Sequence, residues 1–137
     1  KHGMPVAIHT RDAEEDTAAI LTNKYHGVMH CFTSGWGLAK NMLEHGFYFS
    51  ASGILTFKNA ESVRETFTKI PNDRIVIETD SPYLTPHPYR GTKNEPKNIA
   101  LVVEEIAKLK KLSKKHIEDV TFNNACMLFG IKNEKEN

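Results

Sequence analysis

The sequence IVIETDSPYL, from Ile75 to Leu84, joins three β-branched apolar residues to two carboxylates. β-Branched residues suit a packed, pleated surface, and a strand covered on both faces is apolar without alternation, so the segment predicts a buried strand. Side chains two apart on a strand point to the same face, which places Val76, Glu78 and Asp80 together. Because a buried, unpaired charge is costly, we expect the two carboxylates to be neutralised, paired or bound to a metal ion.

The rest of the chain alternates short apolar runs with segments of helical periodicity. Asp12 with Glu15 three positions later indicates a capping box at the start of the first helix. Ser113 is expected to cap the last helix and Gly130 to end it. This order predicts an α/β unit with a parallel sheet and right-handed crossovers. The expected strands are 4–10, 27–32, 47–52 and 75–80, and the expected helices are 12–25, 38–46, 59–70, 98–112 and 113–129.

Polar residues occur at the end of each expected strand. The carboxyl ends of parallel strands lie at one edge of the sheet, where functional groups gather. His9 and Arg11 share one face of the first strand. We therefore expect two imidazoles and two carboxylates to converge at this edge. The strand-end residues are His9, His30, Ser50 or Ser52, and Asp80.

Imidazole nitrogens and carboxylate oxygens form a ligand set for zinc, manganese or iron, and carboxylates with water suit magnesium. The sequence therefore predicts a divalent-metal site at His9, His30 and Asp80. Asp80 is also placed to accept the proton of a water that the metal acidifies. Glu78, one pleat deeper, is expected to orient a ligand or to bind a second ion. Either histidine alone is more simply a hydrogen-bonded surface residue, but both together with Asp80 favour the metal site.

The loop of residues 81–96 is long and rich in proline. Its Arg90, Lys93 and Asn94 carry donors for a phosphate at the mouth of the site, and the alternative is a rigid connector with solvated charges. The expected substrate contacts are Arg90, Asn94 and, from the first strand, Arg11. Cys31 is expected to point away from His30 and to pack in the core.

Composition limits the possible functions. The chain has 137 residues, 39% of them apolar, which is enough for one soluble domain. Its formal net charge is +1, so no general basic field attracts nucleic acid, and any DNA contact has to be local. Two cysteines without a CxxC pair favour a reducing compartment, and no apolar run is long enough to span a membrane. The expected location is the cytoplasm.

Five segments in order, PVAIHTRDA, GVMHCFTSG, ILTFKNA, VIETDSPYLTPHPYRG and NEP, resemble the carboxyl-terminal half of the TatD family of metal-dependent deoxyribonucleases. The resemblance covers nearly the whole chain. It implies a TIM-barrel-like hydrolase fold, exonuclease-like hydrolysis of DNA and a divalent ion, often magnesium, with two ions in the complete site. The family's metal-binding positions match His9, His30 and Asp80, with Asp80 also as the base. Two positions depart from the family pattern: Gly35 comes one residue later than usual, and Thr92 replaces a basic residue after the RG pair.

The family's His-x-His motif and its metal-bridging glutamate lie amino-terminal to the matching segments. Four strand–helix units amount to about half of a barrel of roughly 250 residues. We therefore expect residues 1–137 to be the carboxyl-terminal half of such a barrel, with open sheet edges covered by the missing half or by a second chain. The leading prediction is a DNA-cleaving hydrolase that is weak or inactive as this chain alone. The alternatives are an amidohydrolase-like enzyme acting on a small molecule, and a non-catalytic α/β module that self-associates.

Overall fold

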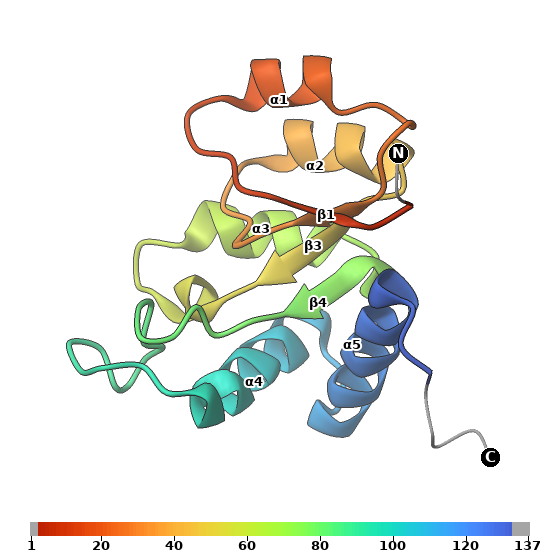
Figure 1. The fold of residues 1–137 in the computed structure, drawn as a ribbon. Coiled ribbons are helices and arrows are strands. Elements are labelled where there is room, and N and C mark those ends of the chain that lie inside the picture. Colours follow the sequence, from red (N-terminus) through yellow and green to blue (C-terminus); the bar gives the residue numbers. More distant parts are fainter. Residues whose placement is uncertain (1–2, 133–137) are drawn as a thin grey trace.

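The centre of the fold is a parallel four-stranded sheet. The computed structural model describes residues 3–132. The strand order is β1-β2-β3-β4, and each neighbouring pair is parallel. Because the order is sequential, each connection passes through a helix and returns to the adjacent position (Figure 1). This confirms the predicted α/β class. The strands are β1 (Val6–Ile8), β2 (Gly27–Met29), β3 (Tyr48–Ala51) and β4 (Ile75–Ile77).

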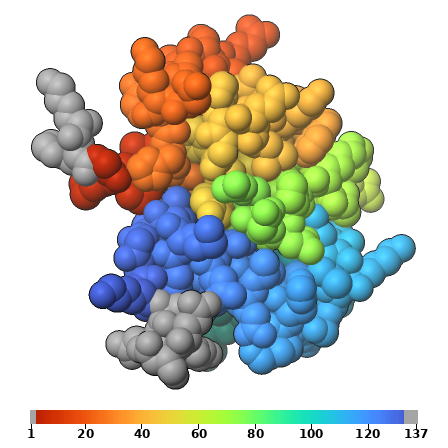
Figure 2. All heavy atoms as spheres, turned by 90° about the vertical axis from the view of Figure 1, so that its right-hand side faces the viewer, coloured from red at the N-terminus to blue at the C-terminus, as the bar shows by residue number. Residues whose placement is uncertain are grey.

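The α-helices form two groups around the sheet. In Figure 1, α1 and α2 lie above the strands and α4 and α5 lie below β4; α4 packs in the same core as α2 and α3. Figure 2 shows the same division after a turn of the molecule, with α1 and α2 in orange to yellow at the top and α5 in blue below. No helix within residues 3–132 has the length and apolar character needed to cross a bilayer. The helices are α1 (Glu14–Ile20), α2 (Trp36–Glu44), α3 (Glu61–Lys69), α4 (Ile99–Lys110) and α5 (Lys114–Phe129), with 3-10 turns η1 (Gly53–Thr56), η2 (Asn72–Arg74) and η3 (Pro96–Asn98).

The two faces of the sheet bury different side chains. Met29 and Phe49 are fully buried in the main core, together with residues of α2, α3 and α4. The opposite face carries a smaller cluster with α5, formed by Val28, Tyr48, Val76 and Leu128. Burial of apolar surface, worth roughly 25 cal/mol per Å², stabilises both clusters. Two positions further along β2, β3 and β4, the same face continues with His30, Ser50 and Glu78.

Several predicted boundaries differ from the observed ones. The Asp12–Glu15 capping box is wrong, because Asp12 has a φ of 52° and the residue before α1 is Ala13. The predicted cap of the last helix is confirmed: Ser113 Oγ accepts a hydrogen bond from the backbone N–H of His116. Every strand is shorter than predicted, since the residues expected at its end leave the ladder. These residues form the edge of the sheet described next.

Candidate metal centre

The chain leaves β4 just before the two carboxylates. Ile77 is the last strand residue, although the Glu78 N–H still donates to the carbonyl of Ala51 at 2.9 Å. Asp80 then adopts a left-handed conformation with a φ of 55°. The predicted alternation to residue 80 is therefore wrong, because the backbone turns before Asp80. The turn nevertheless brings the Asp80 carboxylate beside Glu78.

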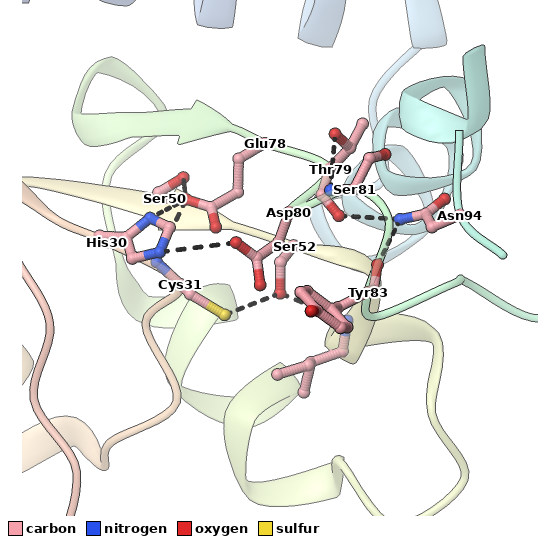
Figure 3. Close-up of polar contacts among 11 residues, drawn as sticks. His30, Cys31, Ser50, Ser52, Glu78, Thr79, Asp80, Ser81, Tyr83 and Asn94 are labelled. Atoms are coloured by element: carbon pink, nitrogen blue, oxygen red, sulfur yellow. Dashed lines mark hydrogen bonds and ion pairs between the residues drawn. The ribbon is translucent and has the colours of Figure 1, made fainter. Parts of the chain in front are cut away.

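His30 lies between these two carboxylates, just beyond the end of β2 (Figure 3). Its Nδ1 is 2.9 Å from Glu78 Oε2, and its Nε2 is 3.8 Å from Asp80 Oδ1. One ligand atom from each of the three residues lies within 4.8 Å of the others. Within the described part of the chain, this is the one such group of three histidine, cysteine or acidic residues.

His9 lies beside this group without being part of it. The ring centroids of His9 and His30 are 5.9 Å apart, and the planes are tilted by 51°. Both residues line one hollow. His9 is not among the residues whose ligand atoms lie within 4.8 Å of one another. Of the predicted ligands, the structure thus brings His30 and Asp80 together with Glu78, and places His9 across the hollow.

The hollow has a volume of about 490 Å³, and several of the residues that line it have a left-handed backbone conformation. Four lining residues, Asp12, Cys31, Asp80 and Leu84, have φ angles between 46° and 55°. Such left-handed residues cost about 1–3 kcal/mol each and persist only where the surroundings hold them in place. The full lining is His9, Thr10, Arg11, Asp12, Glu14, His30, Cys31, Thr33, Ser34, Ile54, Asp80 and Leu84.

The donor set fits a divalent cation. One imidazole and two carboxylates supply the nitrogen and oxygen ligands that zinc and manganese accept, and the carboxylates with water suit magnesium. Glu78 Oε1 is buried and has no hydrogen-bond partner among the described residues. A buried carboxylate oxygen without a donor needs a cation or a proton nearby. The geometry therefore agrees with a metal-binding role for this edge of the sheet.

Comparison with known proteins supports the same reading. The profile of a family described as TatD related DNase matches residues 1–130. The chain belongs to the TatD family. It is 46% identical over 132 residues to the uncharacterized metal-dependent hydrolase YabD of Bacillus subtilis, and 46% identical over 131 residues to the metal-dependent hydrolase YcfH of Escherichia coli K12. In fold it matches the crystal structure of YjjV, a TatD homolog of Escherichia coli, with a TM-score of 0.84 at 24% identity.

This TatD chain spans about half the length of the curated relatives it matches. The YabD alignment covers 93% of this chain and 52% of YabD, and the YcfH alignment covers 93% and 49%. The structural match to YjjV likewise covers 93% of this chain and 51% of the YjjV chain. Its parallel strand–helix units therefore correspond to about half of the TIM-barrel-like fold of the TatD hydrolases, as the sequence predicts.

Cys31 is a residue of the TatD site that sequence reasoning missed. It is buried as expected, but its φ of 46° brings it into the lining of the hollow with His30, where strand alternation had placed it on the other face. Its Sγ is 3.4 Å from Ser52 Oγ. Burial raises the pKa of the thiol, and the nearby Glu78 and Asp80 carboxylates raise it further, against a lowering by the Ser52 hydrogen bond. The thiol is thus kept neutral, which disfavours a cysteine nucleophile.

The three predicted substrate contacts have different surroundings. Arg11 lines the hollow with its side chain 85% exposed, and lies 3.9 Å from the Asp12 carboxylate. Arg90 lines a neighbouring hollow, where its guanidinium stacks 3.7 Å from the Phe57 ring centroid. Arg11 therefore keeps exposed donors at the hollow of the metal centre, whereas Arg90 is outside that lining and its Nη1 donates to the carbonyl of Thr85 at 2.9 Å.

Asn94 is the exception among the predicted contacts. It is only 3% exposed, and its amide donates both hydrogens, to the carbonyls of Thr79 at 2.8 Å and Tyr83 at 2.7 Å. Its Oδ1 accepts from the Glu95 N–H and from Asn98 Nδ2. No N–H of the side chain remains for a phosphate, so the structure gives Asn94 the role of holding the loop of residues 79–83 in place of the predicted substrate contact.

Proposed function

We propose that residues 1–137 are the carboxyl-terminal half of a metal-dependent hydrolase that cleaves DNA phosphodiester bonds in an exonuclease-like manner. The observation that supports this most is the group of His30, Glu78 and Asp80, whose ligand atoms lie within 4.8 Å of one another. The family description as a DNase points to the substrate, and the names of the relatives to metal-dependent hydrolysis. A cytoplasmic location is part of the proposal and agrees with two free thiols.

Each residue of the centre has a proposed task. His9, His30 and Asp80 would hold a divalent ion (magnesium, zinc or manganese), which would supply polarisation of a phosphoryl oxygen and acidification of a water molecule. Asp80 would accept the proton of the attacking water, as general base. Arg11 and Arg90 present guanidinium groups to phosphate oxygens, for which their planar fork is suited. Glu78 orients His30.

The proposed centre is incomplete in this chain. A complete site with two ions needs further ligands, and β1 and β4 each have one edge without a strand partner among the described residues. Met4, Met127 and Phe129 are more than half exposed, and a chain packed over them would bury their apolar surface. We propose that an amino-terminal half, or a second chain, covers these edges, and that this chain alone binds metal weakly and hydrolyses DNA poorly.

A chimera tests this function. The matched half of YabD is replaced by this chain, and hydrolysis of a single-stranded oligonucleotide with Mn²⁺ is compared for YabD, the chimera and the chain alone. We expect activity in the chimera comparable to that of YabD, and little in the chain. Equal activity of the isolated chain would contradict the half-site, and an inactive chimera beside an active YabD would contradict the proposed residues.

The Arg90→Ala chimera separates DNA from a small neutral substrate. Losing a charged donor to a phosphate removes about 1.5–3 kcal/mol, so DNA hydrolysis should fall about tenfold or more. Hydrolysis of an uncharged ester or amide should change less than about twofold, since no charged group is paired there. An unchanged rate on DNA would contradict the phosphate contact and favour the small-molecule amidohydrolase alternative, and an equal fall on both substrates would assign Arg90 a structural role through Phe57 and Thr85.

A further inference from the structure

Three donors from two neighbouring strands converge on one oxygen of Glu78. Glu78 Oε2 lies 2.9 Å from His30 Nδ1 and accepts the backbone N–H of Cys31 at 3.1 Å. It also accepts the hydroxyl of Ser50 (Figure 3). Ser50 belongs to β3 and is 3% exposed. The carboxylate is thus held between β2, β3 and β4 at one point, and Oε1 is left without a donor among the described residues.

This arrangement selects one form of His30. A carboxylate oxygen only accepts hydrogen bonds, so in the neutral imidazole Nδ1 must carry the proton. The lone pair then lies on Nε2, the nitrogen 3.8 Å from Asp80 Oδ1. A carboxylate behind a ligating histidine fixes the tautomer and ring orientation at many metal sites.

We propose that Ser50 is a positioning residue of this centre, which holds the Glu78 carboxylate where it fixes His30 as the Nδ1–H tautomer with Nε2 directed toward Asp80. The inference rests on the proposed function for its use in metal binding, but the tautomer itself requires no metal. Ser50 acts through Glu78 and not on the substrate. The alternative is that Ser50 bonds Glu78 only because its buried hydroxyl needs a hydrogen-bond partner, with no effect on His30.

Ser34 offers a matched control for Ser50. It is also buried, at 7% exposure, and its Oγ also donates to a carboxylate, Glu14 Oε1, at 2.9 Å. Unlike Ser50, Ser34 lines the hollow next to His30. Ser34→Ala therefore makes the same chemical change near the site without touching Glu78 or His30. A general loss of packing would change the His30 tautomer in both serine variants. Loss of the hydrogen bond that positions Glu78 would change it in Ser50→Ala alone.

The test is ¹⁵N NMR of the His30 ring in the metal-free chain, at a pH above the titration of imidazole. We expect Nδ1–H in the wild type, a mixture of tautomers in Ser50→Ala, mainly Nε2–H in Glu78→Leu, and the wild-type form in Ser34→Ala. Ser50→Thr, which keeps the hydroxyl, should restore Nδ1–H. The proposal would be overturned if the His30 ring of the wild type carried its proton on Nε2. It would also be overturned if Ser50→Ala kept the wild-type tautomer while circular dichroism showed an intact fold.

Calorimetric titration of Mn²⁺ adds a second measurement. Loss of a carboxylate that orients a ligand typically weakens metal binding by about 10- to 100-fold, which is expected for Glu78→Leu, with a smaller loss for Ser50→Ala and none for Ser34→Ala. An Mn²⁺ affinity equal in all variants would overturn the role of Ser50 and Glu78 in metal binding. If no variant, including the wild type, binds Mn²⁺ while the tautomers shift as expected, metal binding by this chain alone is refuted and the positioning of His30 by Ser50 and Glu78 stands; an inactive chimera is the separate result that refutes the proposed function.

Discussion

Asp80→Asn is expected to lower DNA hydrolysis by the YabD chimera by about a thousandfold or more. A general base contributes about 10²–10⁴-fold, and the same substitution also weakens a metal ligand. The fold should be preserved, because asparagine is one of the few residues that tolerates the left-handed backbone of position 80, where φ is 55°. Steady-state rates with saturating Mn²⁺ measure the change, and thermal unfolding confirms the fold.

Asp12 provides the control for this substitution. It lines the same hollow and is also left-handed, with a φ of 52°, but its carboxylate is 94% exposed and points to Arg11. Asp12→Asn should change the rate less than about threefold, in line with the small value of an exposed ion pair. A similar fall for both variants would mean that the charge of the hollow, and not Asp80 itself, supports catalysis.

Asn94→Ala is expected to lower the free energy of unfolding of the chain by about 2–3 kcal/mol. The substitution removes the donors to the Thr79 and Tyr83 carbonyls, and an unsatisfied buried polar group costs about 1–3 kcal/mol. Because these carbonyls flank Asp80, the metal affinity should fall as well. Urea unfolding and Mn²⁺ titration of the same samples measure both effects.

The exposed Asn59 serves as the comparison for Asn94. Asn59→Ala should change the free energy of unfolding by less than about 0.5 kcal/mol, as for most surface substitutions. If Asn94→Ala were as stable as the wild type but bound oligonucleotide more weakly in the chimera, the role predicted from the sequence, a phosphate contact, would be correct and the loop-holding role wrong.

Much of the architecture was predictable from local patterns. Short apolar runs placed the four strands along the chain, and helical periodicity placed the buried side chains of α3 and α4. Polar residues after each strand then predicted where His30 and Asp80 would meet, because parallel strands end at one edge. Ser113 and Gly130 marked α5, since their capping roles depend only on neighbouring residues.

The missed details depend on contacts distant in sequence. Left-handed backbone at Asp12, Cys31 and Asp80 has no local signal in non-glycine residues, yet Cys31 lines the hollow and the chain turns at Asp80. Asn94 resembled a free donor because its partners are 11 and 15 residues away in the chain. Tertiary contacts, and not local preference, set these positions.

Calorimetric titration of Mn²⁺ into this chain tests the metal centre most directly. The wild type, His30→Ala, Asp80→Asn and His116→Ala are compared; the last removes an exposed histidine in the first turn of α5. We predict weak but measurable binding in the wild type and in His116→Ala, and a loss of at least about tenfold in the other two. Equal binding in all four proteins, or none in the wild type, would contradict a metal centre formed by His30 and Asp80.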